Sequence, residues 1–385
     1  MKAKSHYSTI TDPYRAGIEL AEQIADIKPE ALFIFPTIHY RGSPELVEAI
    51  YDVMENDELI LIGLTGDGFY EQHKVANAGV SALGINSSNK IKWNIHYETG
   101  LDAKPFQTAK NCLSKLNREG NPQLYFVVSD FRTDATKMVS ALQKYSKAPL
   151  VGGLAGDDDS FQSCFVYANR NVLTNSLAIL AMEGDFGYNI NLAHKMQPIG
   201  NPGKITKSKL TTIQTIDNLP AMDYIEREMG KPIEVVDQGI ITLKITNKPN
   251  DTAHRILSVL LPEKNINDLS IKLFGGVDNG DYAQVCLAPP DIIIKDVKNI
   301  TSSIGSLSFN PVAALEISCA GRKKRLAGNI ENEVTDILQS CPTLNGLAGF
   351  PSFGEIGSIN LEKGYSPPMF HNMTFILLLL GDAGN

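Results

Sequence analysis

The sequence predicts a mixed α/β (α+β) protein with two sheet-rich halves, each covered by helices. Apolar runs typical of strands alternate along the chain with segments whose apolar residues recur at helical spacing. A short glycine motif also recurs after a strand, at residues 63–67 (GLTGD), 153–157 (GLAGD) and 346–350 (GLAGF). The repeated order of strand, helix, strand, glycine loop, strand and strand indicates a duplicated unit, whose equivalent loops we expect to gather around one site.

The composition restricts both the class of protein and its partners. At 385 residues the chain is long for one domain, so two domains are expected. The formal net charge of −8 argues against nucleic acid as a partner. The apolar run at 375–380 is too short to cross a bilayer, so we expect no membrane span. Five cysteines without a C-x-x-C pair fit a reducing cytoplasm and argue against a disulfide framework or a structural zinc site.

The first unit opens with an amphipathic helix over 12–25, because Asp12 can cap it and Pro13 suits its first turn. The later elements of this unit are a strand at 32–35, a helix at 43–54, a strand at 59–62 that leads into the first glycine loop, and strands at 75–83 and 91–97.

The second unit repeats this order after a linking helix. Its elements are that helix at 102–118, a strand at 124–128, a helix at 133–142, a strand at 150–151 before the second glycine loop, a hairpin of 164–167 and 173–181, and a closing strand at 189–196. We predict an N-terminal helix within 1–28, then a first domain over 29–203 that contains the repeats 31–100 and 123–200. The glycine- and proline-rich stretch before residue 204 marks the boundary to a second domain over 204–385.

The second domain repeats the theme at least once. Its expected elements are strands within 204–216, a helix over 220–230, strands at 233–245 and 271–274, a strand at 312–317, a helix at 331–338, a strand at 343–344 before the third glycine loop, and a core strand at 373–380.

Four stretches carry a resemblance to a known family. Residues 149–157 (PLVGGLAGD) and 193–200 resemble the N-terminal FIST domain, whereas 318–322 (SCAGR) and 347–357 (LAGFPSFGEIG) resemble the C-terminal FIST domain. The four stretches occur in the expected order, and the resemblance covers roughly residues 31–380.

The resemblance implies a sensory, small-ligand-binding protein of prokaryotic signal transduction. Family members are thought to bind small ligands such as amino acids, and many are fused to kinase or cyclic-dinucleotide output domains. Because the FIST-like region fills this chain, it is similar to free-standing members, and we expect it to act on a separate histidine kinase or cyclic-dinucleotide enzyme. Some free-standing members are haem proteins that sense nitric oxide, so a haem-based sensor is the alternative. An uncharacterised enzyme is the second alternative.

Three candidate site residues lie in the second and third glycine motifs: Gly153, Asp157 and Gly349. Backbone N–H groups in a tight glycine turn can hold an anion or a carboxylate. The other interpretation, favoured for any single loop, is that glycine merely permits a strained turn. Asp157 either binds a ligand ammonium or accepts hydrogen bonds from N–H groups of its own loop. None of the motifs matches a nucleotide-binding fingerprint.

The C-terminal signature contains Cys319, Arg322, Phe353 and Glu355. The planar guanidinium of Arg322 suits a carboxylate, which belongs either to a ligand or to Glu355 in an internal ion pair. Glu355 in turn either binds a ligand ammonium or accepts hydrogen bonds from neighbouring N–H groups of its loop. We place Phe353 at the same site. Cys319 ends a core strand and is more simply a small apolar residue than a nucleophile or thiolate ligand.

If the protein holds haem, His194 is the first candidate for the iron ligand, because a neutral imidazole binds haem iron, and His39, His96 and His371 remain alternatives. A histidine on a strand is more often an ordinary hydrogen-bonded residue, and the sequence has no C-x-x-C-H motif. It also has no serine-hydrolase or zinc-peptidase signature, so we assign no catalytic residue and no metal ligand.

Overall fold

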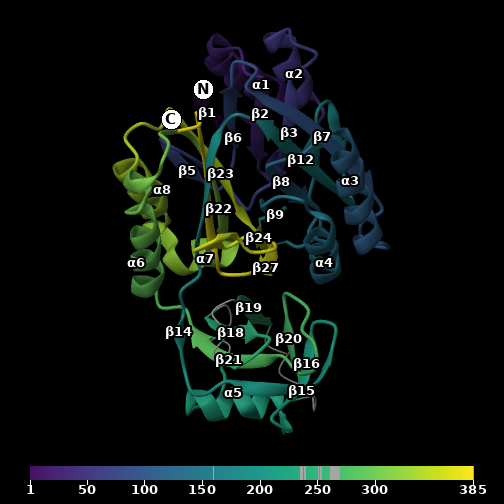
Figure 1. Ribbon diagram of the computed structural model, residues 1–385, viewed down its shortest axis with the longest axis vertical. Coiled ribbons are helices and arrows are strands. Elements are labelled where there is room, and N and C mark those ends of the chain that lie inside the picture. Colours follow the sequence, from purple (N-terminus) through teal and green to yellow (C-terminus); the bar gives the residue numbers. More distant parts are fainter. Residues whose placement is uncertain are drawn as a thin grey trace.

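Three six-stranded sheets with the same internal order form the larger part of the fold (Figure 1). The structure is a computed structural model, which describes residues 1–158, 160–234, 237, 240–249, 251, 254–260 and 269–384. Helices cover the outside of the sheets, so the mixed α/β class is confirmed. No helix in this described part is both long and apolar enough to cross a membrane.

The strands of the three sheets correspond one to one. The first sheet has the order β1 (Lys2–Ser8), β6 (Val80–Asn86), β2 (Ala31–Pro36), β3 (Ile60–Leu64), β10 (Val166–Ala168) and β11 (Asn171–Leu173). The second has the order β7 (Ile91–Thr99), β12 (Ser176–Gly184), β8 (Leu124–Ser129), β9 (Leu150–Leu154), β24 (Glu355–Gly357) and β27 (Met369–His371). The third has the order β13 (Gly187–Ala193), β28 (Phe375–Gly381), β22 (Pro311–Cys319), β23 (Gly346–Ser352), β4 (Phe69–Glu71) and β5 (Lys74–Ala76).

The last two strands of each sheet come from a different repeat of the chain. β4 and β5 follow β3 in sequence but border β23, β10 and β11 follow β9 but border β3, and β24 and β27 follow β23 but border β9. The exchange is therefore cyclic, and each repeat completes the sheet of another. The sequence pattern predicts two repeats and a partial third, whereas the sheets show three equivalent repeats.

The inner faces of the three sheets meet in one apolar core, while helices cover the outer faces. In that core the ring of Phe33 lies 5.2 Å from that of Phe126, and Phe35 stacks on Phe350 at 5.0 Å. The covering helices are α1 (Pro13–Ile24) and α2 (Glu45–Met54) on the first sheet, α3 (Pro105–Glu119) and α4 (Ala135–Tyr145) on the second, and α6 (Pro290–Thr301), α7 (Ala320–Leu326) and α8 (Glu331–Ser340) on the third.

The strand register shows which glycines of the repeated motif are equivalent. Gly63, Gly152 and Gly349 pair in parallel with Ile34, Val127 and Glu316 of the neighbouring strand. A Cβ on these glycines would lie only 2.0, 1.8 and 2.0 Å from the carbonyl oxygens of the same three partners. Alignment of the motifs by sequence equates Gly63 with Gly153 and Gly346. Relative to the structure, this alignment is wrong by one residue in the second repeat and by three residues in the third. The third motif is also not a loop, because it lies within β23.

The segments at the ends of β3, β9 and β23 join the three repeats in a ring of backbone hydrogen bonds. The N–H of Gly156 donates to Thr65 O at 2.7 Å, that of Asp67 donates to Pro351 O at 3.0 Å, and that of Phe353 donates to Leu154 O at 3.2 Å. The three loop regions thus gather at one place, as the recurring motif predicts.

A separate β-barrel lies between β13 and α6 in sequence and forms the lower part of the molecule in Figure 1. Its strand order is β14 (Gln197–Pro198), β21 (Tyr282–Leu287), β15 (Gly203–Lys209), β16 (Thr212–Ile216), β20 (Ile271–Leu273), β19 (Arg255–Leu260) and β18 (Ile241–Thr246). β18 also pairs with β21, which closes the barrel, and β17 (Leu219–Pro220) pairs with β16. Helix α5 (Ala221–Met229) packs beside it.

The structure differs from the expected elements in several places. Strand β1 and helices α6 and α7 were not predicted, and the strand expected at 75–83 is divided between β5 and β6. The strand expected at 233–245 begins at Ile241, and residues 235, 236, 238 and 239 lie outside the described residues. The domain division at residue 203 stays a prediction; β13, which precedes it, pairs with β28, which follows it.

Candidate functional site

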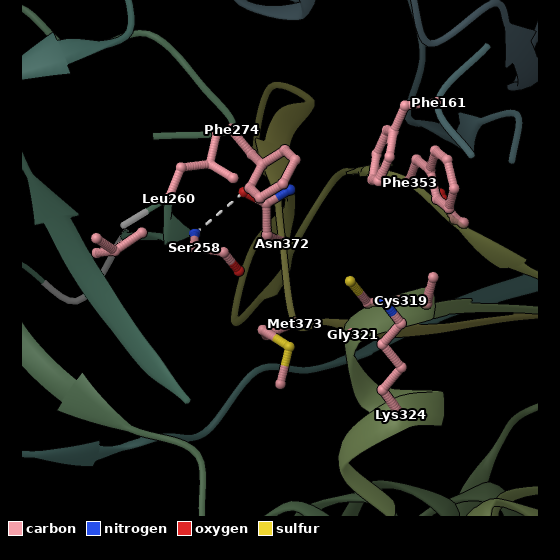
Figure 2. Close-up of a pocket in the computed structure, with 13 residues that line it drawn as sticks. Phe161, Ser258, Leu260, Phe274, Cys319, Gly321, Lys324, Phe353, Asn372 and Met373 are labelled. Atoms are coloured by element: carbon pink, nitrogen blue, oxygen red, sulfur yellow. Dashed lines mark hydrogen bonds between the residues drawn. The ribbon is translucent and has the colours of Figure 1, made fainter. Parts of the chain in front are cut away.

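A cavity of about 550 Å³ lies between the barrel and the three-sheet core (Figure 2). The barrel contributes side chains from β19 and from the segment after β20, and the core contributes side chains from α7, from the loops at 161 and 353, and from the chain after β27. The lining residues are Phe161, Ser258, Val259, Leu260, Phe274, Cys319, Ala320, Gly321, Lys324, Ser352, Phe353, Asn372 and Met373.

One side of the cavity is aromatic. Phe161 stacks on Phe353 with 4.6 Å between ring centroids, and Phe274 of the barrel lies 6.4 Å from Phe161. Phe161 and Phe274 remain 50% and 36% exposed, so their faces are open to a ligand. Phe353 was predicted at the site, and the structure places it in the cavity wall.

Asp157 shapes the loop that carries Phe161. Its buried carboxylate accepts hydrogen bonds from the N–H groups of Phe161 at 2.8 Å and Ser163 at 2.9 Å, and from Ser160 Oγ at 2.7 Å. Of the two predicted roles for Asp157, the structure therefore shows the acceptor for N–H groups of its own loop. Asp157 does not line the cavity; it holds Phe161 there.

The cavity wall also carries polar groups. Asn372 Oδ1 accepts a hydrogen bond from Ser258 N at 3.2 Å, which ties the core to the barrel (Figure 2). The Nδ2 group of Asn372 donates no hydrogen bond within the described residues, which leaves a donor for a ligand. Lys324, on α7, contributes a cationic side chain to the same cavity.

Cys319 and Glu355 lie close to each other. Cys319 lines the cavity, and burial raises the pKa of its thiol, so the thiol stays protonated. Burial likewise raises the pKa of Glu355 well above its usual value, although hydrogen bonds from Thr374 N and from Cys319 act in the opposite direction. Glu355 is fully buried, and its Oε2 accepts from Thr374 N at 3.1 Å. It does not line the cavity.

Arg322 is not available to a ligand. Its Nε and Nη2 donate to Glu333 Oε1 at 3.0 and 2.6 Å, and the side chain is 1% exposed. The expected internal ion pair with Glu355 is wrong, because the partner is Glu333 of α8. Sequence reasoning missed Glu333, since it occupies an apolar-facing position of a helix that the pattern predicts as amphipathic.

Gly153 and Gly349 have packing roles in the sheets. Gly153 pairs with Glu355 across β9 and β24, and a Cβ on it would lie 2.7 Å from Ser352 Oγ. Gly349 pairs with Tyr70 of β4 and faces the Glu316 carbonyl. Neither glycine lines the cavity. Both therefore fit the interpretation that glycine permits close backbone packing, and not the interpretation that it binds an anion.

His194 lies away from this cavity, beside two other histidines. Its ring centroid is 4.4 Å from that of His254 and 5.9 Å from that of His371. Burial, with the nearby His254 and Lys244, lowers the pKa of His194 to about 3.

These surroundings do not fit haem. The His254 ring occupies the space beside the imidazole, and the adjoining cavity of about 340 Å³ is near the lower end of the size range of small-ligand sites. A macrocycle bound through His194 would need this space to be wider and lined by more apolar side chains.

The cavity residues that sequence reasoning missed are chiefly Phe161, Phe274, Asn372 and Met373. None of the four had a signal in the sequence, because a single large apolar residue such as Phe161 or Phe274 at an exposed position is common in folded proteins.

Comparisons with known proteins confirm the resemblance to the FIST domains. The patterns of the FIST N domain and the FIST C domain match residues 30–219 and 231–358. The uncharacterized protein MJ1623 of Methanocaldococcus jannaschii is 24% identical over 237 residues, which are 57% of this chain and 45% of that protein. The chain therefore spans about half the length of this curated relative.

Solved structures show more distant likenesses. A cyanuric acid hydrolase from A. caulinodans aligns over 99% of both chains with 8% identity and a TM-score of 0.34. PurL of T. maritima complexed with ATP aligns over 99% of this chain and 71% of that chain, with 12% identity and a TM-score of 0.22. At these scores neither activity is carried over to this chain.

Proposed function

This chain belongs to the FIST family, whose domains are associated with sensing small ligands in signalling, and from that premise we propose that the cavity between the barrel and the core is its ligand site. The observation that carries the proposal is the cavity itself. Its volume of about 550 Å³ lies within the range of small-molecule sites, and such sites are frequent at junctions between modules.

The chemistry of the walls suggests a carboxylate-bearing ligand with an apolar body, such as an amino acid. Phe161, Phe274 and Phe353 offer apolar faces, and Asn372 Nδ2 and the Lys324 ammonium are donors suited to a carboxylate. Arg322 and Glu355, which the sequence suggested as the ligand-binding pair, act behind the wall instead.

A ligand in this position would contact both modules at once. Ser258 and Phe274 belong to the barrel, whereas Phe353 and Met373 belong to the core. A ligand that contacts both the barrel and the core stabilises the arrangement in which both modules contact it. The resulting shift in the population of arrangements is the signal. We propose that a separate histidine kinase or cyclic-dinucleotide enzyme recognises that arrangement.

A thermal-shift screen of the full chain against amino acids and small carboxylates tests this function. A binder at a hundred times its Kd should stabilise the fold by about 2.7 kcal/mol. Phe353→Ala should abolish the shift, while Leu361→Ala, at a residue 49% exposed and absent from the cavity wall, should keep it. If no compound of the set stabilises the wild type, or if Phe353→Ala responds as fully as the wild type, the site is elsewhere.

The two alternatives have weaker support. The surroundings of His194 do not fit haem; a Soret band after reconstitution with haem, lost in His194→Ala, would reverse that assessment. For an enzyme, the guanidinium of Arg322 is already bound to Glu333, and the Cys319 thiol is held in its unreactive protonated form. Turnover of a bound compound that is lost in a cavity variant would favour the enzyme.

A further inference from the structure

A second cavity, of about 340 Å³, lies where the chain leaves β13 and enters the barrel. Its charged and titratable lining consists of His194 and Lys195 after β13, Lys244 of β18, His254 before β19, Cys286 of β21 and Asp296 of α6. The other lining side chains are apolar. The cavity is separate from the proposed ligand site, with which it shares no lining residue.

The charge in this cavity is positive. Lys244 forms no hydrogen bond or ion pair within the described ranges, although it is only partly exposed. The carboxylate of Asp296 accepts a hydrogen bond from the backbone N–H of Lys195 at 2.8 Å, so one of its oxygens already has a hydrogen-bond partner. Burial keeps the Cys286 thiol neutral by raising its pKa.

Three ring nitrogens near Lys244 have no hydrogen-bond partner among the described residues. They are the buried Nδ1 of His194 and both buried ring nitrogens of His371. Buried polar atoms are rarely left in this state, and an ion or water commonly explains the exceptions. His371 is fully buried beside the His194 ring, and Arg255 lies close enough to help lower its pKa.

A metal ion fits these surroundings poorly. In the described part of the chain, no group of three or more His, Cys, Asp or Glu side chains is arranged to hold one. Lys244 and Arg255 lie close enough to affect the titration of His194 and His371, and their charges repel a cation. The nearby acidic residues Asp278 and Asp281 interact electrostatically with Arg255. The carboxylate of Asp281 lies 3.7 Å from the Arg255 guanidinium.

We propose that this second cavity binds a small oxyanion, a phosphate or carboxylate group, with Lys244 supplying the charge and His194 a ring N–H. An imidazole donor and an ammonium are both suited to an anionic oxygen. Because Lys244 lies in the barrel and His194 directly follows β13 of the core, the bound anion fastens the barrel to the core. The site is independent of the ligand proposed for the larger cavity.

Calorimetric titration of the full chain with inorganic phosphate and, separately, with acetate at constant ionic strength tests the proposal. We expect saturable binding of at least one anion, and the tighter of the two identifies the class. Lys244→Met should weaken it by about tenfold or more, as the loss of a charge-assisted hydrogen bond implies. Lys272→Met, which removes an exposed lysine of the same barrel, should leave it within about twofold.

Lys244→Arg and His194→Gln keep the test meaningful if Lys244→Met fails to fold. The arginine variant should retain binding, and the glutamine variant should weaken it. Three results would overturn the proposal: no saturable binding of either anion, equal affinity in Lys244→Met and Lys272→Met, or binding of Zn²⁺ alone that is lost in His194→Gln.

Discussion

Arg322 and Glu333 form an ion pair that is almost completely buried, with Nη2 2.6 Å and Nε 3.0 Å from the same carboxylate oxygen. Their side chains are 1% and 2% exposed. The other Glu333 oxygen accepts a hydrogen bond from Ser318 Oγ at 2.7 Å, so the carboxylate joins α7, α8 and β22 behind the wall of the larger cavity. The residue that the sequence marked for a ligand thus stabilises the wall of the proposed site.

Removing either member of this pair should destabilise the protein strongly. Arg322→Met leaves Glu333 buried without its cation, and the expected loss in the free energy of unfolding is about 3–5 kcal/mol. Denaturant unfolding monitored by circular dichroism measures it. The double variant Arg322→Met with Glu333→Leu should recover part of the loss, because no charge remains buried alone.

Lys4→Met provides the comparison for that measurement, since Lys4 and Asp26 form an exposed ion pair at 3.0 Å. Its expected cost is below about 1 kcal/mol. A loss in Arg322→Met no larger than that in Lys4→Met would show that the buried pair does not hold the elements together.

The three equivalent glycines should be intolerant of any side chain. Gly152→Ala places a Cβ 1.8 Å from the Val127 carbonyl oxygen, a contact that requires the backbone to move. We expect a loss of several kcal/mol, on the order of an overpacked core, and the same for Gly63→Ala and Gly349→Ala. Gly328→Ala is the control, because a Cβ there meets nothing within 4 Å. Soluble yield and thermal unfolding compare the four, and a Gly152→Ala protein as stable as Gly328→Ala would contradict the close approach.

The sequence predicts the features that depend on residues near one another in the chain, but not those that depend on residues far apart in it. Most helices and buried strands of the first two repeats follow from local periodicity. The recurring glycine motif correctly predicts segments that gather, although its third copy is part of a strand and not a loop. The cyclic exchange of strands cannot be predicted in this way, because the partners of β4 and β24 lie hundreds of residues away and weak local patterns do not specify them. The same limit applies to Arg322, whose Glu333 partner becomes evident only when α7 and α8 pack together.

Asp157 should be needed for the shape of the loop that carries Phe161. Asp157→Asn replaces one acceptor oxygen with a donor that faces N–H groups, so several hydrogen bonds to a charged acceptor are lost. We expect a cost of about 1.5–3 kcal/mol and weaker binding of whatever ligand the screen identifies. Asp158→Asn, at the exposed next residue, should change neither quantity. Equal effects in the two variants, measured by unfolding and ligand titration, would remove this role from Asp157.

Glu355 should make the stability depend on pH in the direction opposite to that of an ordinary ion-paired carboxylate. Burial raises the pKa of Glu355 in the folded state above the ordinary value of 4.5, so the folded protein keeps a proton that the unfolded chain releases. The stabilisation is complete below pH 4.5 and decreases as pH rises toward the folded pKa, by up to about 1.4 kcal/mol per pH unit.

Glu355→Gln keeps the shape of the neutral acid but cannot ionise. The difference in unfolding free energy between this variant and the wild type should therefore move in favour of the variant between pH 5 and pH 8. A difference that stays constant, or that moves toward the wild type, would mean that Glu355 is ionised in the folded protein.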